Sequence, residues 1–277
     1  MFDETYTTST GSFVGIRRCG KENAIKLLFD AHLDEIGFMV KEICSGGFLK
    51  VTGIGGIDTK VLSAMEVWIF GKEKISGIFT SVPPHLRKDT KSKKITIDDM
   101  YIDTGRSKEY LEENVPIGTV VAYKTKTERL QNNRVVGKSF DDKICICTIL
   151  DAFDLLKDRK LNVDLYALFS GGEEITGYVG GTTAAHEFMP DYAVAIDVTN
   201  SYVPESPKRR EENRVGFGGV VSISSTTSRA FTKRFIKVLD EAKYRIKSSA
   251  SPDKHGQMHT FYKYPAQASP QHLYPFH

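Results

Sequence analysis

The chain has 277 residues, of which 40% are apolar and 26% charged, and it carries a net charge of +3. This composition predicts a packed globular protein of one large or two ordinary domains and excludes a disordered chain. Lys and Arg are spread along the chain, and the densest basic stretch, 207–214, contains its own acids, so no nucleic-acid partner is expected. No apolar run reaches the roughly 20 residues that span a bilayer, so no membrane partner is expected either.

The amino terminus and the cysteines indicate a cytoplasmic protein. The first residues do not have the pattern of a signal peptide, and the four cysteines form no CxxC pair. Cys145 and Cys147 fall in a stretch with helical spacing, where their side chains point to different faces. We therefore expect buried free thiols rather than a disulfide or a zinc site.

The first half of the chain predicts strands. Residues 24–32 have the pattern of a short buried strand, and residues 36–43 have that of a second. From 45 to 124, short β-like pieces alternate with glycine turns, which is typical of a small barrel. Residues 124–134 are expected to form the linker back to the first domain.

The second half alternates between helix and strand. Helices are predicted over 140–158, 178–188 and 228–244, and strands over 163–170 and 192–199. The last helix places one apolar stripe along its length: Phe231, Phe235, Val238, Leu239 and Ala242. Strands alternating with helices indicate an α/β sheet. The predicted organisation is an α/β domain over 1–44 and 125–277, interrupted by a β insert over 45–124.

Acids or histidine follow four predicted strand ends or turns: His32 and Asp34, Asp141 and Asp142, Glu173 and Glu174, and Asp197. Taken singly, each has an ordinary interpretation, such as a core histidine, a helix N-cap or a turn aspartate. In an α/β sheet, however, the carboxyl ends of parallel strands meet at one edge, where ligand sites gather. Carboxylates gathered there would repel one another, and a pair of divalent cations would remove that repulsion.

One histidine with several carboxylates suits zinc, cobalt or manganese. Hydrolysis at two metals also needs a carboxylate that bridges the ions and an unligated carboxylate that deprotonates the attacking water. Two adjacent glutamates with different roles, Glu173 and Glu174, fit that requirement.

Several motifs then occur in the order found in one known family. They are "AHLDEIGFMV", "GGFLKVTGIGGID", "GIFTSVPPHL", "YIDTG", "GKSFDDK", "SGGEEITGYVGG" and "AIDVTN". Over roughly Thr5 to Gly256 the chain resembles the M42 metallopeptidases, which are dinuclear-metal aminopeptidases of the glutamyl and tetrahedral aminopeptidase type. The resemblance implies a three-layer α/β/α metallopeptidase domain interrupted by a small β-barrel domain.

The resemblance also implies a metal-ligand set. His32 and Asp197 would bind one divalent ion, Glu174 the other, and Asp141 would bridge them. Asp142 would follow Asp141 through a peptide that is often cis in these proteins.

The remaining implications concern catalysis and assembly. Glu173 would be the general base, and Asp34 would orient the ring of the metal-binding histidine. The substrate would be a peptide, from which the N-terminal residue is removed. The β insert would serve assembly of a homo-oligomer, a dodecamer in many intact relatives.

The sequence departs from the family pattern at both ends. The resemblance leads us to expect about 40 helical residues before the first strand, which this sequence does not show. After Gly256, related chains continue with a GTDA motif and a strand, then a histidine that completes the second ion's ligand set. This chain instead carries four tail histidines, His255, His259, His272 and His277, to which no metal is assigned.

A shift of reading frame accounts for the second departure. One G added in the codon of Gly256, with suitable synonymous codons, restores GTDA and then GIPTALISIP in register. Residues 257–277 are therefore expected to be out of frame.

Two other functional interpretations remain open at this stage. A glycoside hydrolase could use Glu173 with Asp197 as its pair of carboxylates. Alternatively, the chain is an inactive, degenerate product that lacks the last metal-binding histidine.

Overall fold

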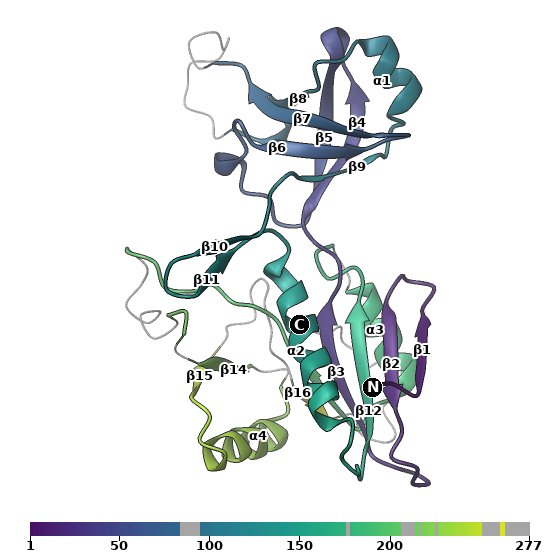
Figure 1. The fold of residues 1–277 in the computed structure, drawn as a ribbon, viewed down its shortest axis with the longest axis vertical. Helices are drawn as coiled ribbons and strands as arrows, with labels where there is room; N and C mark the ends of the chain where they lie inside the picture. The colour runs from purple at the N-terminus through teal and green to yellow at the C-terminus, as the bar shows by residue number, and fades with distance from the viewer. Residues whose placement is uncertain are drawn as a thin grey trace. The chain divides into compact units, whose positions relative to one another are not determined.

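In the computed structural model the chain divides into two compact units (Figure 1). The structure describes residues 1–83, 95–175, 178–205, 214–216, 218–224, 227–250 and 261–263. One unit comprises Met1–Asp34 and Phe140–His277, and the other comprises Glu35–Ser139. The second unit is longer than the 45–124 expected from sequence, because residues 37–43 form one of its barrel strands and residues 128–136 form a hairpin.

A six-stranded mixed sheet forms the centre of the first unit. Its order is β1 (Glu4–Thr7), β2 (Phe13–Arg17), β12 (Asp164–Ser170), β3 (Lys26–His32), β13 (Tyr192–Ala195) and β16 (Phe261–Lys263). β12 and β13 both pair parallel to β3, and Ser170 lies opposite His32. The carboxyl ends of these three strands therefore meet at one edge of the sheet.

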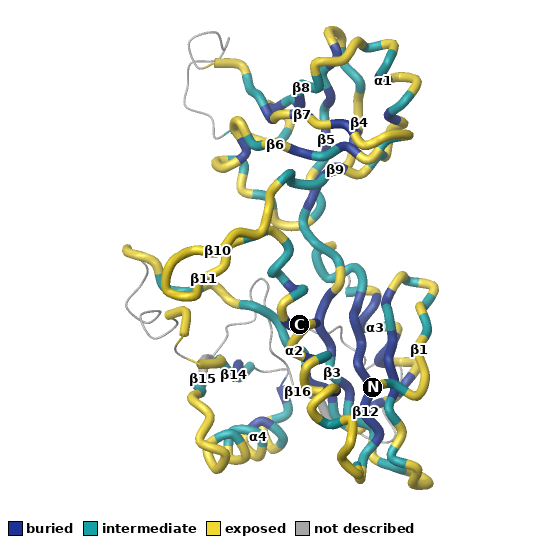
Figure 2. Tube along the Cα trace, in the orientation of Figure 1, coloured by how far each residue is buried: buried dark blue, intermediate teal, exposed yellow. Residues whose placement is uncertain are grey.

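Helices cover both faces of this sheet. Every residue of β12 is buried (Figure 2), and alternate side chains point to opposite faces. Leu165, Ala167 and Phe169 pack against helix α2 (Phe140–Leu156). Tyr166 and Leu168 pack against helix α3 (Val179–Phe188). The predicted three-layer α/β/α architecture is confirmed, with one apolar core on each face of the sheet.

Helix α4 (Arg229–Glu241) packs beside β13 through part of its predicted stripe. Phe231 stacks on Tyr192 at 4.7 Å, and Phe235 and Leu239 join the same cluster. Val238, however, is 54% exposed, and Ile236 takes its place in the cluster.

The stripe also stops short of its predicted end. The helix ends at Glu241, so Ala242 lies beyond it and is exposed. The contact patch is therefore narrower than the amphipathic pattern suggested. Strands β14 (Gly219–Ile223) and β15 (Ile246–Ala250) form a separate parallel pair.

The second unit contains a closed barrel, as predicted. Its strands, in barrel order, are β4 (Gly37–Ile43), β5 (Phe48–Ile54), β8 (Met100–Asp103), β7 (Lys74–Ser81), β6 (Glu66–Phe70) and β9 (Val120–Tyr123). Inward-facing side chains at alternate positions, among them Phe38, Phe79 and Ile102, fill its interior. Helix α1 (Lys108–Asn114) starts at Ser107, whose hydroxyl accepts the Tyr110 N–H.

The expected linker over 124–134 is partly a β-hairpin. Strand β10 (Glu128–Leu130) pairs antiparallel with β11 (Arg134–Val136), and all six residues are exposed. The sequence there has no apolar alternation to indicate a strand, because neither face of the hairpin is buried.

All four cysteines are free, but they differ in burial. On α2, Cys145 is buried and Cys147 is exposed, so the prediction of a buried thiol was wrong for Cys147. Two positions along a helix turn the side chain by about 200°, which takes it from the sheet side to solvent. Within the described part of the chain, no helix is both long and apolar enough to cross a membrane.

Candidate metal centre

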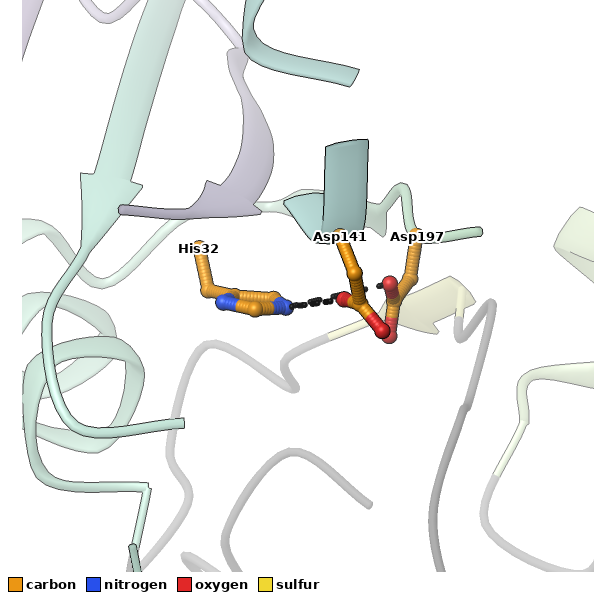
Figure 3. Close-up of side chains that lie close together, drawn as sticks. All are labelled: His32, Asp141 and Asp197. Carbon is orange, nitrogen blue, oxygen red and sulfur yellow. Dashed lines mark hydrogen bonds and ion pairs between the residues drawn. The ribbon is translucent and has the colours of Figure 1, made fainter. Parts of the chain in front are cut away.

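His32 is the last residue of β3 and is only 4% exposed. Its Nε2 lies 2.9 Å from Oδ1 of Asp141, at the start of α2 (Figure 3). The same nitrogen lies 3.9 Å from Oδ1 of Asp197, which follows β13 by two residues. Three segments far apart in the sequence thus direct polar side chains at one point.

The turn after β12 adds the two glutamates. Oε2 of Glu173 lies 3.9 Å from His32 Nε2. The turn itself is fixed at Gly171, whose N–H donates to the buried Ser12 hydroxyl at 3.1 Å and whose carbonyl accepts the Gly180 N–H at 2.9 Å. At the glutamates, the Asp34 carboxylate accepts both main-chain N–H groups.

The other ring nitrogen of His32 fixes its orientation. Nδ1 lies 3.0 Å from the main-chain carbonyl oxygen of Asp34, which can only accept a hydrogen bond. Nδ1 therefore carries a proton, and Nε2 faces the carboxylates. Because Nε2 also lies against the carboxylate oxygen of Asp141, the ring holds a second proton in this arrangement. A bound cation would replace that second proton, leaving the Nε2 lone pair as a ligand.

Two groups of side chains at this edge are close enough to share an ion each. One is His32, Asp141 and Asp197; the other is His32, Glu173 and Glu174. Within each group, one ligand atom per residue lies within 4.8 Å of the others. The six residues proposed from sequence, these five and Asp34, are therefore brought together.

The pKa values show an excess of negative charge. Burial opposes protonation of His32, but the carboxylates of Asp141 and Asp34 raise its pKa to about 11. Burial, together with the charges of Asp142 and Asp141, raises the pKa of Asp197 to about 8. Burial and the charges of Asp141 and Glu173 raise the pKa of Glu174 to about 7. Acids that hold protons near neutral pH, beside a doubly protonated histidine, have the chemistry of a cation site.

Two further carboxylates lie beneath the cluster. Asp142 is fully buried and follows Asp141 through a cis peptide, and Asp30 is 7% exposed in the middle of β3. Burial raises the pKa of each to about 7. Sequence reasoning assigned no role to Asp30; the signal that could have found it is an acid inside an otherwise apolar strand, "KLLFDAH".

Some residues considered from sequence lie outside the described residues. The four tail histidines are among them, as is most of the basic stretch 207–214. Of the two histidines in the described part, His32 belongs to the cluster and His186 is exposed on α3.

A cluster of partly exposed carboxylates around one buried histidine, at the carboxyl edge of a parallel sheet, defines a candidate metal-dependent hydrolase. The sequence profile of the M42 glutamyl aminopeptidase family matches residues 11–255. The chain therefore belongs to the M42 family of peptidases.

Individual relatives agree with this assignment. The lysyl aminopeptidase of Pyrococcus furiosus is 32% identical over 208 residues, covering 73% of this chain and 59% of that protein. The TET aminopeptidase of a marine sediment thaumarchaeote superposes with a TM-score of 0.81 at 29% identity, covering 90% of this chain and 72% of that one. The Pyrococcus horikoshii TET1 peptidase, described as assembling into a tetrahedron or a large octahedral shell, gives 0.77 at 26% identity, covering 89% and 74%. The chain thus spans less than two thirds of the length of that curated relative.

Proposed function

We propose that this protein is an aminopeptidase that removes N-terminal residues from peptides, using two divalent metal ions and a glutamate base. The observation that carries the proposal is the convergence of His32 with four carboxylates at the sheet edge, in two overlapping groups of ligand spacing. Membership of the M42 family supports the same reaction.

The ligands divide between the two ions as follows. His32 and Asp197 would bind one ion, Glu174 the other, and Asp141 would bridge them. Zinc, cobalt and manganese all suit one imidazole with several carboxylates. When bound, such ions polarise a substrate carbonyl and lower the pKa of water.

Glu173 would act as the base that takes a proton from the attacking water and passes it to the leaving amine. Burial raises its pKa, and a base works best when its pKa lies near the working pH. Its carboxylate lies 3.9 Å from His32 Nε2, so it borders the proposed ions, and we assign the ligand role to its neighbour Glu174.

We also propose a homo-oligomer, built in part through the barrel unit. The assembly described for the P. horikoshii TET1 peptidase supports this. Light scattering of the purified chain tests it, and a monomer at micromolar concentration would contradict it.

Two competing functions are tested alongside. A glycoside hydrolase acting through Glu173 and Asp197 has no use for His32 or Asp141, so cleavage of a glucan that survives chelator treatment would favour it. An inactive product would bind few ions and cleave nothing. The family match stops at residue 255, directly before the proposed frame change, and resequencing the gene around Gly256 tests that proposal.

The decisive experiment compares the wild type with Glu173→Gln on aminoacyl p-nitroanilides. General base catalysis contributes about 10²–10⁴-fold, so kcat should fall by at least 100-fold. The metal content of Glu173→Gln should equal that of the wild type, because Glu173 is not a proposed ligand. Full activity in Glu173→Gln, or wild-type activity that is insensitive to chelator, would refute the proposal.

A further inference from the structure

We infer that the carboxylate of Asp34, beside its charge interaction with the ring of His32, is a positioning residue for the turn that carries Glu173 and Glu174. The inference rests on the proposed function and deepens it. It gives Asp34, two residues after His32, the role of holding the turn that carries the proposed base Glu173 and the proposed ligand Glu174.

The hydrogen bonds of Asp34 carry the argument. Its Oδ1 accepts the N–H of Glu173 at 3.1 Å, and its Oδ2 accepts the N–H of Glu174 at 3.0 Å. Each carboxylate oxygen thus holds one of two successive main-chain donors. Such charge-assisted bonds are about twice as strong as neutral ones, and a pair of them fixes the direction of the main chain.

The contact with His32 is different in kind. The short contact to its Nδ1, 3.0 Å, comes from the main-chain carbonyl oxygen of Asp34, whereas the nearer carboxylate oxygen is 3.7 Å away. A carbonyl oxygen is present whatever side chain occupies position 34. The short hydrogen bond from the ring therefore does not require the aspartate side chain, to which the ring is linked by charge, whereas the two hydrogen bonds to the glutamate turn do require it.

Among the described residues, the other hydrogen bonds of the turn lie before the glutamates. Its anchors to Ser12 and Gly180 both act on Gly171, two residues before Glu173. Glu173 and Glu174 are adjacent in the chain, but their proposed roles, base and metal ligand, need their side chains to point in different directions. Fixing both main-chain N–H groups fixes both side-chain directions at once.

The inference can be tested by measuring the binding of the two proposed ions separately, because each ion depends on a different residue. Glu174 serves one ion, and Asp197 serves the other. Calorimetric titration of the metal-free chain with Zn²⁺ should resolve two binding steps, of which the one at Glu174 should be the weaker, because only Glu174 and the bridging Asp141 are assigned to that ion. Glu174→Gln identifies one step by weakening it, and Asp197→Asn identifies the other.

Asp34→Asn then decides between the two roles. An amide can accept only one of the two N–H groups and presents its own NH₂ to the other. We expect at least a tenfold weakening of the step that Glu174→Gln weakens, a smaller weakening of the other step from the charge lost beside His32, and a tenfold or larger fall in kcat. Weakening confined to the Asp197 step would show action through His32 alone, and no change in either step would show no positioning role; both outcomes overturn the inference.

A matched control comes from the barrel unit. The Asp58 carboxylate also accepts a main-chain N–H, that of Lys60, at 3.0 Å. Asp58→Asn makes the same exchange of carboxylate for amide away from the cluster, where the amide oxygen can still accept the single N–H, and it should leave both binding steps unchanged.

Hydrogen exchange on the unaltered chain covers the case in which Asp34→Asn does not fold. The amides of Glu173 and Glu174 should exchange slowly in the metal-free wild type, because both are bonded to a carboxylate. Exchange at the rate of an unstructured loop would overturn the inference. This result does not depend on metal binding, so failure of the proposed function, seen as a wild type that binds no Zn²⁺, is distinguished from failure of the inference.

Discussion

Gly180 has no room for a side chain, and its replacement by alanine should loosen the glutamate turn. It is the second residue of α3, and its N–H donates to the carbonyl of Gly171. A Cβ at this position would lie 2.4 Å from that carbonyl oxygen, 2.4 Å from the Ser12 hydroxyl and 2.6 Å from the Gly171 nitrogen. All three atoms belong to the network that begins the Glu173 turn, so the start of α3 must move by about 0.6 Å or more to reach a tolerable 3.0 Å.

The expected change in the free energy of unfolding is opposite in sign to the change that helix propensity predicts. In a helix interior, alanine is favoured over glycine by about 1 kcal/mol. Overpacking against main-chain atoms costs about 1–3 kcal/mol, and each disturbed hydrogen bond costs about 1 kcal/mol more. We therefore expect Gly180→Ala to lower the free energy of unfolding by about 2 kcal/mol.

Urea unfolding followed by circular dichroism measures this change. Gly219→Ala is the control, because its Cβ would meet nothing within 4 Å, and it should change stability by less than about 0.5 kcal/mol. Gly180→Ala should also weaken Zn²⁺ binding, since the turn it displaces leads to Glu174. A variant as stable as the wild type, or more stable, would refute this account of the turn.

Two further changes test the core and the charge of the site. Phe153 on α2 is 1% exposed, and its ring packs on that of Phe2 with 5.0 Å between the ring centres. Phe153→Ala should therefore lower the free energy of unfolding in urea by about 3–5 kcal/mol. Leu155→Ala is the control and should have little effect, because the Leu155 side chain is 81% exposed. Zn²⁺ affinity should rise between pH 5 and 8, because metal binding needs the ionised forms of Asp197 and Glu174, whose raised pKa values of about 8 and 7 keep both groups largely protonated in the lower part of that range. Calorimetry in buffers of different ionisation enthalpy should show proton release at pH 7, and an affinity independent of pH would contradict the charge argument.

The elements of the α/β unit could be predicted from local pattern. The strand predicted over 163–170 is β12, the helix predicted over 140–158 is α2, and the barrel has the glycine-punctuated short strands that its sequence suggested. These predictions succeed because burial on one or both faces imposes a period on apolar residues. The hairpin β10–β11 was missed because no face of it is buried, so its sequence carries no such period.

The sequence by itself determined which residues could form the site, because acids and one histidine stand where buried strands end, and the parallel order of β12, β3 and β13 brings those ends together. Only the tertiary structure decided what each group contacts. A carboxylate such as that of Asp34 has the same chemistry whether it faces an imidazole or two main-chain N–H groups, and its sequence position is identical in either case. The burial of Asp30 beneath the cluster and the exposure of Val238 on α4 were equally undecided, since each depends on segments far away in the chain. The order of neighbouring residues sets the local period of apolar side chains, whereas the packing of distant segments decides which groups each side chain contacts.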